Sequence, residues 1–158
     1  MDTNILYKKI YAKIAEANNI LFITHEKPDG DAVGSISAMM ELAENSGKSY
    51  RAYCADAPAA YFNFLPHIEK IITDKNKINF RKCDLIIILD CGDLKRTRLA
   101  NEIINKEKWQ FVINIDHHPK VENNADLEIK NSLAASTSEL VYELFKANKI
   151  KINKRMAN

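Results

Sequence analysis

The sequence predicts an α/β fold, a Rossmann-like parallel sheet with helices on both of its faces. Three segments, residues 20–24, 84–89 and 111–115, are short and almost entirely apolar, which is typical of strands that are buried on both faces. In the segments that separate them, apolar residues recur every three or four positions, which is the spacing of a helix. Strands that alternate with helices pair in a parallel sheet through crossover connections.

The local pattern predicts each element in turn. Helical spacing is clearest over residues 4–17, 31–45 and 136–149. Weaker patterns predict strands at 51–54, 71–72 and 127–129, helices over 99–106 and 61–65, and a loop over 74–79. The 71–72 strand is short enough to lie at an edge of the sheet. Residues 153–158 look like an N-cap and the first turn of a further helix, so we expect residues 1–158 to form one domain that is incomplete at its C-terminal end.

Composition limits the class of protein. The chain has 158 residues, 46% of them apolar, and a formal net charge of +2, which predicts a soluble domain without the basic surface that binds duplex nucleic acid. The three cysteines are odd in number and lack paired spacing, which argues against a disulfide framework and for a reducing compartment. The N-terminus does not resemble a signal peptide, and the apolar run 85–89 is too short to span a membrane. We therefore expect a cytoplasmic protein with no membrane association.

Polar side chains follow three of the predicted strands. The candidates for a functional site are His25, Asp29, Asp31, Asp90, Asp93, Asp116, His117 and His118. Ligands bind at the carboxyl ends of the strands in folds of this type, so we expect these side chains to meet at one edge of the sheet. Carboxylates and imidazoles without thiolates suit Mn²⁺, Mg²⁺ or Fe²⁺ better than structural zinc.

Each cluster alone has an ordinary structural explanation. An Asp-Gly-Asp sequence before a helix is usually a turn with an N-cap, and an adjacent histidine pair is as often structural as functional. Three clusters at successive strand ends instead favour one site, with Asp90 placed to bridge two ions that assist phosphoryl hydrolysis. Arg96, beside Lys95 and Arg98, and Ser136 at a helix start are candidates to bind phosphate, although a solvated helix start and capping explain them equally well.

The motifs resemble those of the DHH phosphoesterase superfamily. The residues that carry the resemblance are 25–31 (HEKPDGD), 89–93 (LDCGD) and 116–119 (DHHP). Residues 114–145 are most similar to the nanoRNase branch, which comprises bifunctional oligoribonucleases and phosphatases of 3′-phosphoadenosine 5′-phosphate. The resemblance implies a metal-dependent phosphoesterase that hydrolyses short oligoribonucleotides, 3′-phosphoadenosine 5′-phosphate or both, by means of a water that two metal ions activate.

The resemblance also implies a role for each site residue. Two Mn²⁺ are expected, with Mg²⁺, Fe²⁺ or Co²⁺ as alternatives. His25 and Asp29 would hold one ion, Asp31 and His117 would hold the other, and Asp90 would bridge the two. In the catalytic pair, His118 would contact the scissile phosphate and Asp116 would orient the histidines.

The chain departs from the family pattern at its end. In the family, a fourth motif supplies one more Asp after the helix that begins near Asn153, and a second domain grips the substrate, yet neither lies within these 158 residues. We therefore expect weak turnover or none from the chain by itself.

Three functions remain open from the sequence. The first is hydrolysis of short single-stranded RNA or a nucleoside bisphosphate. The second is the hydrolysis of a cyclic dinucleotide or of pyrophosphate by a related enzyme. The third is a non-catalytic module that binds nucleotide or metal. The sequence also leaves a homodimer open.

Overall fold

The computed structural model describes residues 2–119 and 125–158, and over these residues the chain forms six strands and four α-helices. The strands are β1 (Asn19–Ile23), β2 (Ser49–Tyr53), β3 (Ile71–Ile72), β4 (Leu85–Leu89), β5 (Phe111–Asp116) and β6 (Leu127–Lys130). The helices are α1 (Thr3–Glu16), α2 (Gly30–Asn45), α3 (Ala100–Ile104) and α4 (Thr137–Ala147). The predicted α/β fold is confirmed.

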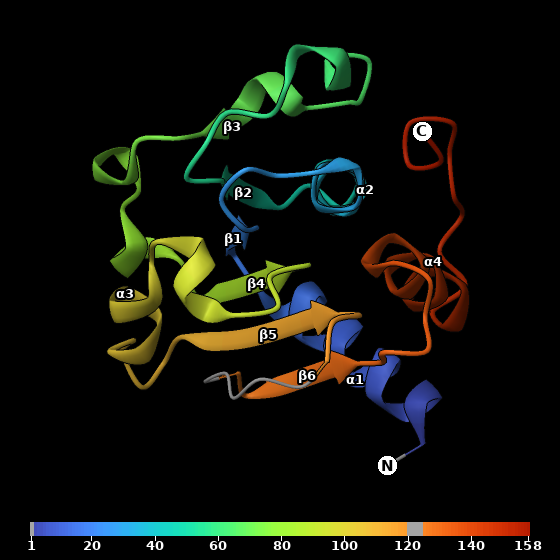
Figure 1. Cartoon of the computed structure of the whole chain (residues 1–158). Coiled ribbons are helices and arrows are strands. Elements are labelled where there is room, and N and C mark those ends of the chain that lie inside the picture. The colour runs from blue at the N-terminus through green and yellow to red at the C-terminus, as the bar shows by residue number, and fades with distance from the viewer. Residues whose placement is uncertain (1, 120–124) are drawn as a thin grey trace.

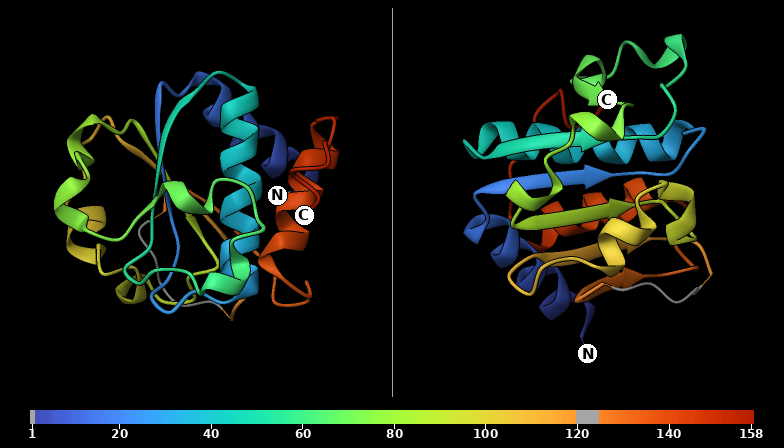
Figure 2. Two further views of the ribbon diagram at one scale, coloured as in Figure 1. Left: turned by 90° about the horizontal axis from the view of Figure 1, so that it is seen from above. Right: turned by 90° about the vertical axis from the view of Figure 1, so that its left-hand side faces the viewer.

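The strands form one sheet in the order β3-β2-β1-β4-β5-β6, and every pair of neighbours is parallel. Their arrows accordingly point the same way (Figure 2, right). Of the six strands, β1 comes first in the sequence, and β2 and β3 follow on one side of it. β4 then pairs with the other side of β1, and β5 and β6 extend the sheet in that direction. The strand order therefore reverses between β1 and β4. In folds of this type such a reversal point leaves a crevice at the carboxyl ends of the two strands.

Alternate residues of the central strands enter two separate apolar layers. In β1, Ile20 and Phe22 pack in the layer that includes α1, α2 and α4, whereas Leu21 and Ile23 pack in the layer that includes α3. Figures 1 and 2 show α1, α2 and α4 together on one face of the sheet and α3 on the other. Because both faces are covered, the strands need apolar residues at successive positions, and this accounts for the continuous apolar runs in the sequence.

The weaker predictions differ from the structure in extent. The short helix expected over residues 61–65 is a single 3₁₀ turn at Ala60–Phe62, and the loop expected over 74–79 contains another at Lys75–Lys77. Pro66 disfavours the helical conformation for the residue before it, so a helix does not continue through Leu65. The edge position of β3 is confirmed.

Two further expectations concern the ends and the thiols. Asn153 does cap a turn, because its side-chain oxygen accepts a hydrogen bond from the backbone N–H of Met156 at 2.8 Å. The cysteines at 54, 83 and 91 are free and buried. Among the described residues, none of the helices is both long and apolar enough to cross a bilayer.

Candidate metal centre

Three neighbouring strands deliver the candidate residues to one edge of the sheet. His25 follows β1, Asp90 directly follows β4, and Asp116 is the last residue of β5, where it precedes the histidine pair. Because β1, β4 and β5 are adjacent and parallel, their carboxyl ends lie side by side. The predicted meeting of the three clusters therefore occurs at the reversal point between β1 and β4.

Two groups of side chains in this cluster have the composition and spacing of metal sites. In each group, one ligand atom from every member lies within 4.8 Å of the others; the groups are His25, Asp29 and Asp90, and Asp90, His117 and His118. Asp90 belongs to both groups. Among the described residues, the arrangement is therefore two adjoining candidate sites with one shared carboxylate.

The distances within the groups fit cation coordination better than direct hydrogen bonding. Nε2 of His25 lies 3.8 Å from Oδ2 of Asp90, and Nε2 of His117 lies 3.5 Å from Oδ1 of Asp90 and 3.6 Å from Oδ2 of Asp31. These separations exceed those of good hydrogen bonds. Two ligands that each lie about 2.1 Å from one ion are separated by roughly 3–4 Å. The donor set therefore fits a divalent cation of the kind that oxygen and imidazole ligands prefer.

Asp90 is held in an unusual conformation in the centre of the cluster. It is 1% exposed, and its backbone φ of 58° lies in the left-handed region, which aspartate tolerates better than most residues. Its Oδ1 accepts a hydrogen bond from Oγ1 of Thr137 at 2.9 Å. Burial and the nearby charges of Asp31 and Asp29 outweigh the interactions that favour the anion, so the pKa of Asp90 is raised. A bound cation would relieve this repulsion.

The orientation of the His25 ring leaves one nitrogen available to a metal. Its Nδ1 lies 2.6 Å from the backbone carbonyl of Glu26, and a carbonyl only accepts, so Nδ1 carries the hydrogen. Nε2 therefore presents its lone pair toward Asp90. Burial lowers the pKa of His25, but the Asp90 carboxylate and the Glu26 carbonyl more than offset burial, and the net pKa is raised. Nη2 of Arg96 lies 3.0 Å from Nδ1; since both groups donate in this tautomer, the approach is a contact and not a hydrogen bond, and it places the cation beside the site.

Asp31 is bound by the N-terminus of α4. Its two carboxylate oxygens accept hydrogen bonds from the backbone N–H groups of Thr137 at 2.7 Å and Ser138 at 2.8 Å, and from the Ser138 hydroxyl at 2.7 Å. A helix N-terminus stabilises a carboxylate through its free N–H groups and its dipole. Oδ1 accepts two of these bonds and Oδ2 accepts one, so Oδ2, which lies 3.6 Å from Nε2 of His117, keeps a lone pair for a cation. Asp29 meanwhile caps α2, because its Oδ1 accepts from the N–H groups of Asp31 and Ala32.

Asp116 fixes the ring of His118. Oδ1 of Asp116 accepts hydrogen bonds from Nδ1 of His118 at 2.8 Å and from its backbone N–H at 3.1 Å, so Nε2 of this ring is left for another partner. Gly92 has a φ of 60°, and a Cβ at that position would lie 3.5 Å from the same ring. Burial raises the pKa of Asp116, but the hydrogen bonds from His118 and the charge of Lys130, whose Nζ is 3.4 Å away, prevail and lower it. The carboxylate therefore stays ionised.

Other predicted residues lie at the margin of the two groups. Asp93 caps the 3₁₀ turn Leu94–Thr97 by accepting from the N–H of Lys95 at 2.9 Å, and Arg98 forms an ion pair with Glu26. Ser136 is the N-cap of α4, where its hydroxyl accepts from the N–H of Glu139 at 3.0 Å. A phosphate contact by Arg96 or Ser136 stays a prediction.

Sequence reasoning missed the roles of Thr137 and Ser138. The Thr137 hydroxyl bonds to Asp90, which is 47 positions away in the sequence, and the Ser138 hydroxyl bonds to Asp31, which is 107 positions away. The available signal was the hydroxyl-rich helix start at 136–138, which gave no means of choosing among its three members. The Ser136 hydroxyl caps α4, whereas the hydroxyls of Thr137 and Ser138 contact the site.

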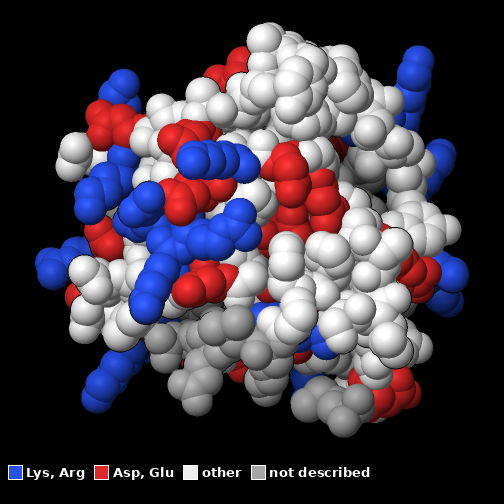
Figure 3. Space-filling view, in the orientation of Figure 1, with Lys and Arg blue, Asp and Glu red and all other residues white. Residues whose placement is uncertain are grey.

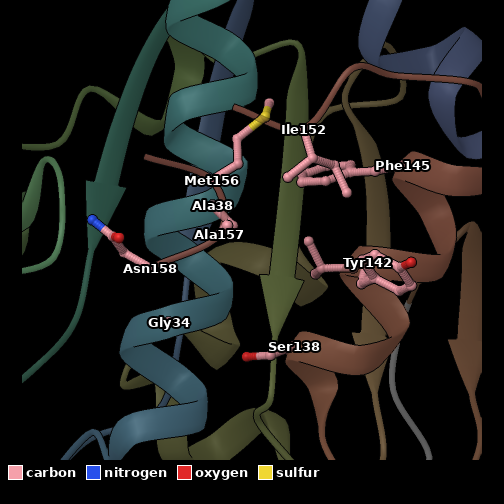
Figure 4. Close-up of a pocket in the computed structure, with 10 residues that line it drawn as sticks. Gly34, Ala38, Ser138, Tyr142, Phe145, Ile152, Met156, Ala157 and Asn158 are labelled. Atoms are coloured by element: carbon pink, nitrogen blue, oxygen red, sulfur yellow. The ribbon is translucent and has the colours of Figure 1, made fainter. Parts of the chain in front are cut away.

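The surface around the cluster is divided by charge. Figure 3 shows acidic side chains near the centre of this face, with lysine and arginine side chains beside them and largely uncharged surface above. A separate, mostly apolar groove of about 320 Å³ runs between α2, α4 and residues 152–158. Figure 4 shows Ser138 toward one end of this groove and Met156 toward the other, so the groove approaches the site at Ser138.

The family follows from comparison with known domains. A family model described as the DHH family, N-terminal domain, matches residues 19–158. The chain belongs to the DHH family. The motifs on which the resemblance was based, at 25–31, 89–93 and 116–119, all fall within the matched region and supply the two groups of the metal centre.

Relatives of this DHH chain show what it is similar to. A probable bifunctional oligoribonuclease and PAP phosphatase NrnA of Streptococcus mutans is 25% identical over 154 residues, which cover 96% of this chain and 46% of that protein. The cyclic-di-AMP phosphodiesterase PdeA of Listeria monocytogenes is 24% identical, over 89% of this chain and 23% of that protein. The chain thus spans less than half the length of either relative.

A solved structure has the same fold as this DHH chain. The crystal structure of an exopolyphosphatase-related protein from Bacteroides fragilis superposes with a TM-score of 0.84 at 24% sequence identity. The match covers 92% of this chain and 44% of that one. The likeness extends the fold assignment to nearly the whole chain.

The hydroxyl of Thr137 provides a test of how the DHH site is held. Thr137→Val removes the hydrogen bond to the buried Asp90 carboxylate but keeps the shape of the side chain. We expect about 1–3 kcal/mol lower free energy of unfolding and roughly 10- to 100-fold weaker Mn²⁺ binding, because the carboxylate loses a charged hydrogen bond and its fixed orientation. Urea unfolding and calorimetric titration measure the two effects. Thr137→Ser keeps the hydroxyl and should retain most of both, and an equal loss in the two variants would refute this role.

Proposed function

We propose that this chain carries the catalytic site of a metal-dependent phosphoesterase that acts on short oligoribonucleotides and nucleoside bisphosphates. The observation that supports this proposal most directly is the sharing of Asp90 between two groups of ligand atoms at the reversal point of the sheet. The family and the relative from Streptococcus mutans, whose name includes oligoribonuclease and PAP phosphatase, support the same class of substrate.

Two divalent ions would be held by His25, Asp29 and Asp90 and by Asp31, Asp90 and His117, with Mn²⁺ as the proposed metal. Nδ1 of His118, the third member of the second group, lies 3.6 Å from Oδ1 of Asp90 but is bonded to Asp116, so we assign His118 to the substrate and Asp31 to the ion. When bound, such ions activate water and neutralise the charge that develops on a phosphoryl group. The fold holds the ligand atoms 3.5–3.8 Å apart, as a shared cation requires. It also keeps Nε2 of His25 free through the Glu26 carbonyl.

The remaining residues act on the substrate rather than on the metal. Asp116 accepts the Nδ1 hydrogen of His118 and stays ionised, so it orients the ring and stabilises a proton on it. In our proposal the Nε2 side of His118 donates to a non-bridging oxygen of the scissile phosphate. Arg96, fixed beside His25, would attract the same anion.

The test is hydrolysis under single-turnover conditions, with the chain in excess over substrate. The substrates are 5′-phosphorylated diadenylate, 3′-phosphoadenosine 5′-phosphate and cyclic diadenylate, each with and without Mn²⁺. We expect slow, Mn²⁺-dependent release of AMP from the first two, and none with Asp90→Asn. Cleavage of cyclic diadenylate alone would favour the activity named for the relative from Listeria monocytogenes. Mn²⁺-dependent nucleotide binding without any product, found also when the second domain of the family is present, would favour a non-catalytic module.

A further inference from the structure

The connection between β2 and β3 exposes aromatic rings to solvent. Tyr61 is 73% exposed and Phe64 is 68% exposed. Single exposed apolar residues are common, but two large exposed rings only three positions apart in one connection need an explanation. In Figure 1 this green segment lies above α2, and Figure 3 shows largely uncharged surface there.

Phe62 connects these rings to the metal centre. Its ring lies 3.5 Å from the point that a Cβ on Gly30 would occupy, and Gly30 separates the predicted ligands Asp29 and Asp31. The centroids of the Tyr61 and Phe62 rings are 4.4 Å apart, with the planes inclined at 55°. The aromatic pair therefore adjoins the loop that carries two of the carboxylates.

The pair is also anchored to the helix that begins at the site. Phe62 packs against a buried cluster of Val33, Leu65 and Ile68, and Val33 belongs to α2, close to its start. Tyr61 is held by its contact with Phe62 while its own ring stays in solvent. A ring that is positioned before a ligand arrives loses little freedom when the ligand binds.

We propose that Tyr61, supported by Phe62 and extended by Phe64, is a stacking surface for the nucleobase of a nucleotide whose phosphate lies at the metal centre. The inference rests on the proposed function and adds how the substrate is recognised. Stacking on an aromatic ring is the usual way in which proteins hold unpaired bases, and it tolerates any base because every base has a π-face. The surface therefore selects nucleotides over other phosphoesters without reading their sequence.

The experiment compares AMP with ribose 5-phosphate, which carries the same phosphate and sugar without the base. Binding of each to the Mn²⁺-loaded chain is measured by calorimetry. We expect AMP to bind roughly 5- to 100-fold more tightly, the range that stacking of one base produces. Tyr61→Ala should bring the affinity for AMP close to that for ribose 5-phosphate and leave the latter unchanged. Tyr61→Phe should keep the preference, since the ring and not the hydroxyl supplies it.

The matched control is Trp109→Ala. Trp109 is 56% exposed and precedes β5, at the opposite end of the sheet from the site, so its removal should leave both affinities unchanged. Circular dichroism confirms that each variant is folded.

The outcomes separate the two proposals. Equal binding of AMP and ribose 5-phosphate, dependent on Mn²⁺ and lost in Asp90→Asn, would refute the stacking surface and leave the proposed function standing. A preference for AMP that survives both Tyr61→Ala and Phe64→Ala would also refute it. The stacking surface would also be refuted if Tyr61→Ala abolished self-association of the chain but left the preference for AMP unchanged. The rings would then bind another copy of the protein. Failure to bind Mn²⁺ would overturn the proposed function and the stacking surface together.

Discussion

Asp90→Asn is expected to abolish Mn²⁺ binding at both positions, and not only at one. Asp90 contributes an oxygen to each group of ligand atoms, so its loss weakens both. Asparagine keeps the size of the side chain and an acceptor for Thr137, but it carries no charge. We expect binding to be weaker by a factor on the order of 100 or more, measured by calorimetric titration and by the electron paramagnetic resonance of free Mn²⁺.

The same variant should not be less stable without metal. Burial, together with the charges of Asp31 and Asp29, raises the pKa of Asp90, which shows that the anion is disfavoured where it lies. A neutral side chain removes the cost of burying this charge beside two other carboxylates. The metal-free variant should therefore unfold at the same temperature as the wild type or a higher one. With Mn²⁺ at about 100 times the wild-type dissociation constant, each bound ion should stabilise the wild type by about 2.7 kcal/mol, whereas the variant should gain less than about 0.5 kcal/mol per site.

Asp93→Asn is the matched control, because Asp93 also follows β4 but caps a turn outside both groups. Its Mn²⁺ affinity should equal that of the wild type. Unchanged Mn²⁺ binding in Asp90→Asn, or an equal loss in Asp93→Asn, would contradict the shared-ligand arrangement.

Glu41→Gln is expected to have the largest effect on stability at neutral pH. Glu41 lies in α2 with 4% exposure, and its carboxylate accepts hydrogen bonds from Asn45 at 3.1 Å and from Asn153 and Arg155 at 2.9 Å, while Nε2 of His67 lies 2.7 Å away. It therefore ties the segment that follows α4 to α2. Burial raises the pKa of Glu41, but Arg155, Asn153, His67 and Asn45 prevail and lower it to about 2.

The direction of the pH effect follows from this shift. The carboxyl is a stronger acid in the folded chain, where its pKa is about 2, than in the unfolded chain, where its pKa is 4.5, so the unfolded state takes up the proton first as the pH falls. The stabilisation is complete above about pH 5 and is lost as the pH falls toward about 2. A shift of this size corresponds to roughly 3 kcal/mol.

Urea unfolding at several pH values from neutral down to about pH 3 measures the effect. Glu41→Gln should be about 2–3 kcal/mol less stable than the wild type at neutral pH, and the difference should shrink as the pH falls. Glu44→Gln is the control on the same helix, since the Glu44 side chain is 49% exposed and its ion pair with Lys70 is expected to contribute little. A difference that stays constant over the whole pH range would show that the charge of Glu41 is not the source.

The Glu41 network also marks a limit of sequence reasoning. His67 is isolated in the sequence and carries no signal of a role, yet in the structure it is 4% exposed and contacts a carboxylate 26 positions away. Arg155, another partner of Glu41, lies 88 positions after His67 in the sequence. Such contacts depend on how α2, the β2–β3 connection and the C-terminal segment pack together, which no local pattern encodes.

The amino-acid pattern was sufficient to predict the central strands, the three long helices and the clusters of candidate ligands. Continuous apolar runs identify strands buried on both faces, and a parallel sheet brings their carboxyl ends to one edge, so His25, Asp90 and Asp116 could be grouped from the amino-acid pattern alone. The shared position of Asp90 was also predicted, whereas the bonds from Thr137 to Asp90 and from Ser138 to Asp31, and the contact of Phe62 with Gly30, became visible in the folded chain alone. The physical reason is that periodicity reports which face of an element is buried. The partner that covers that face is chosen by packing between distant segments.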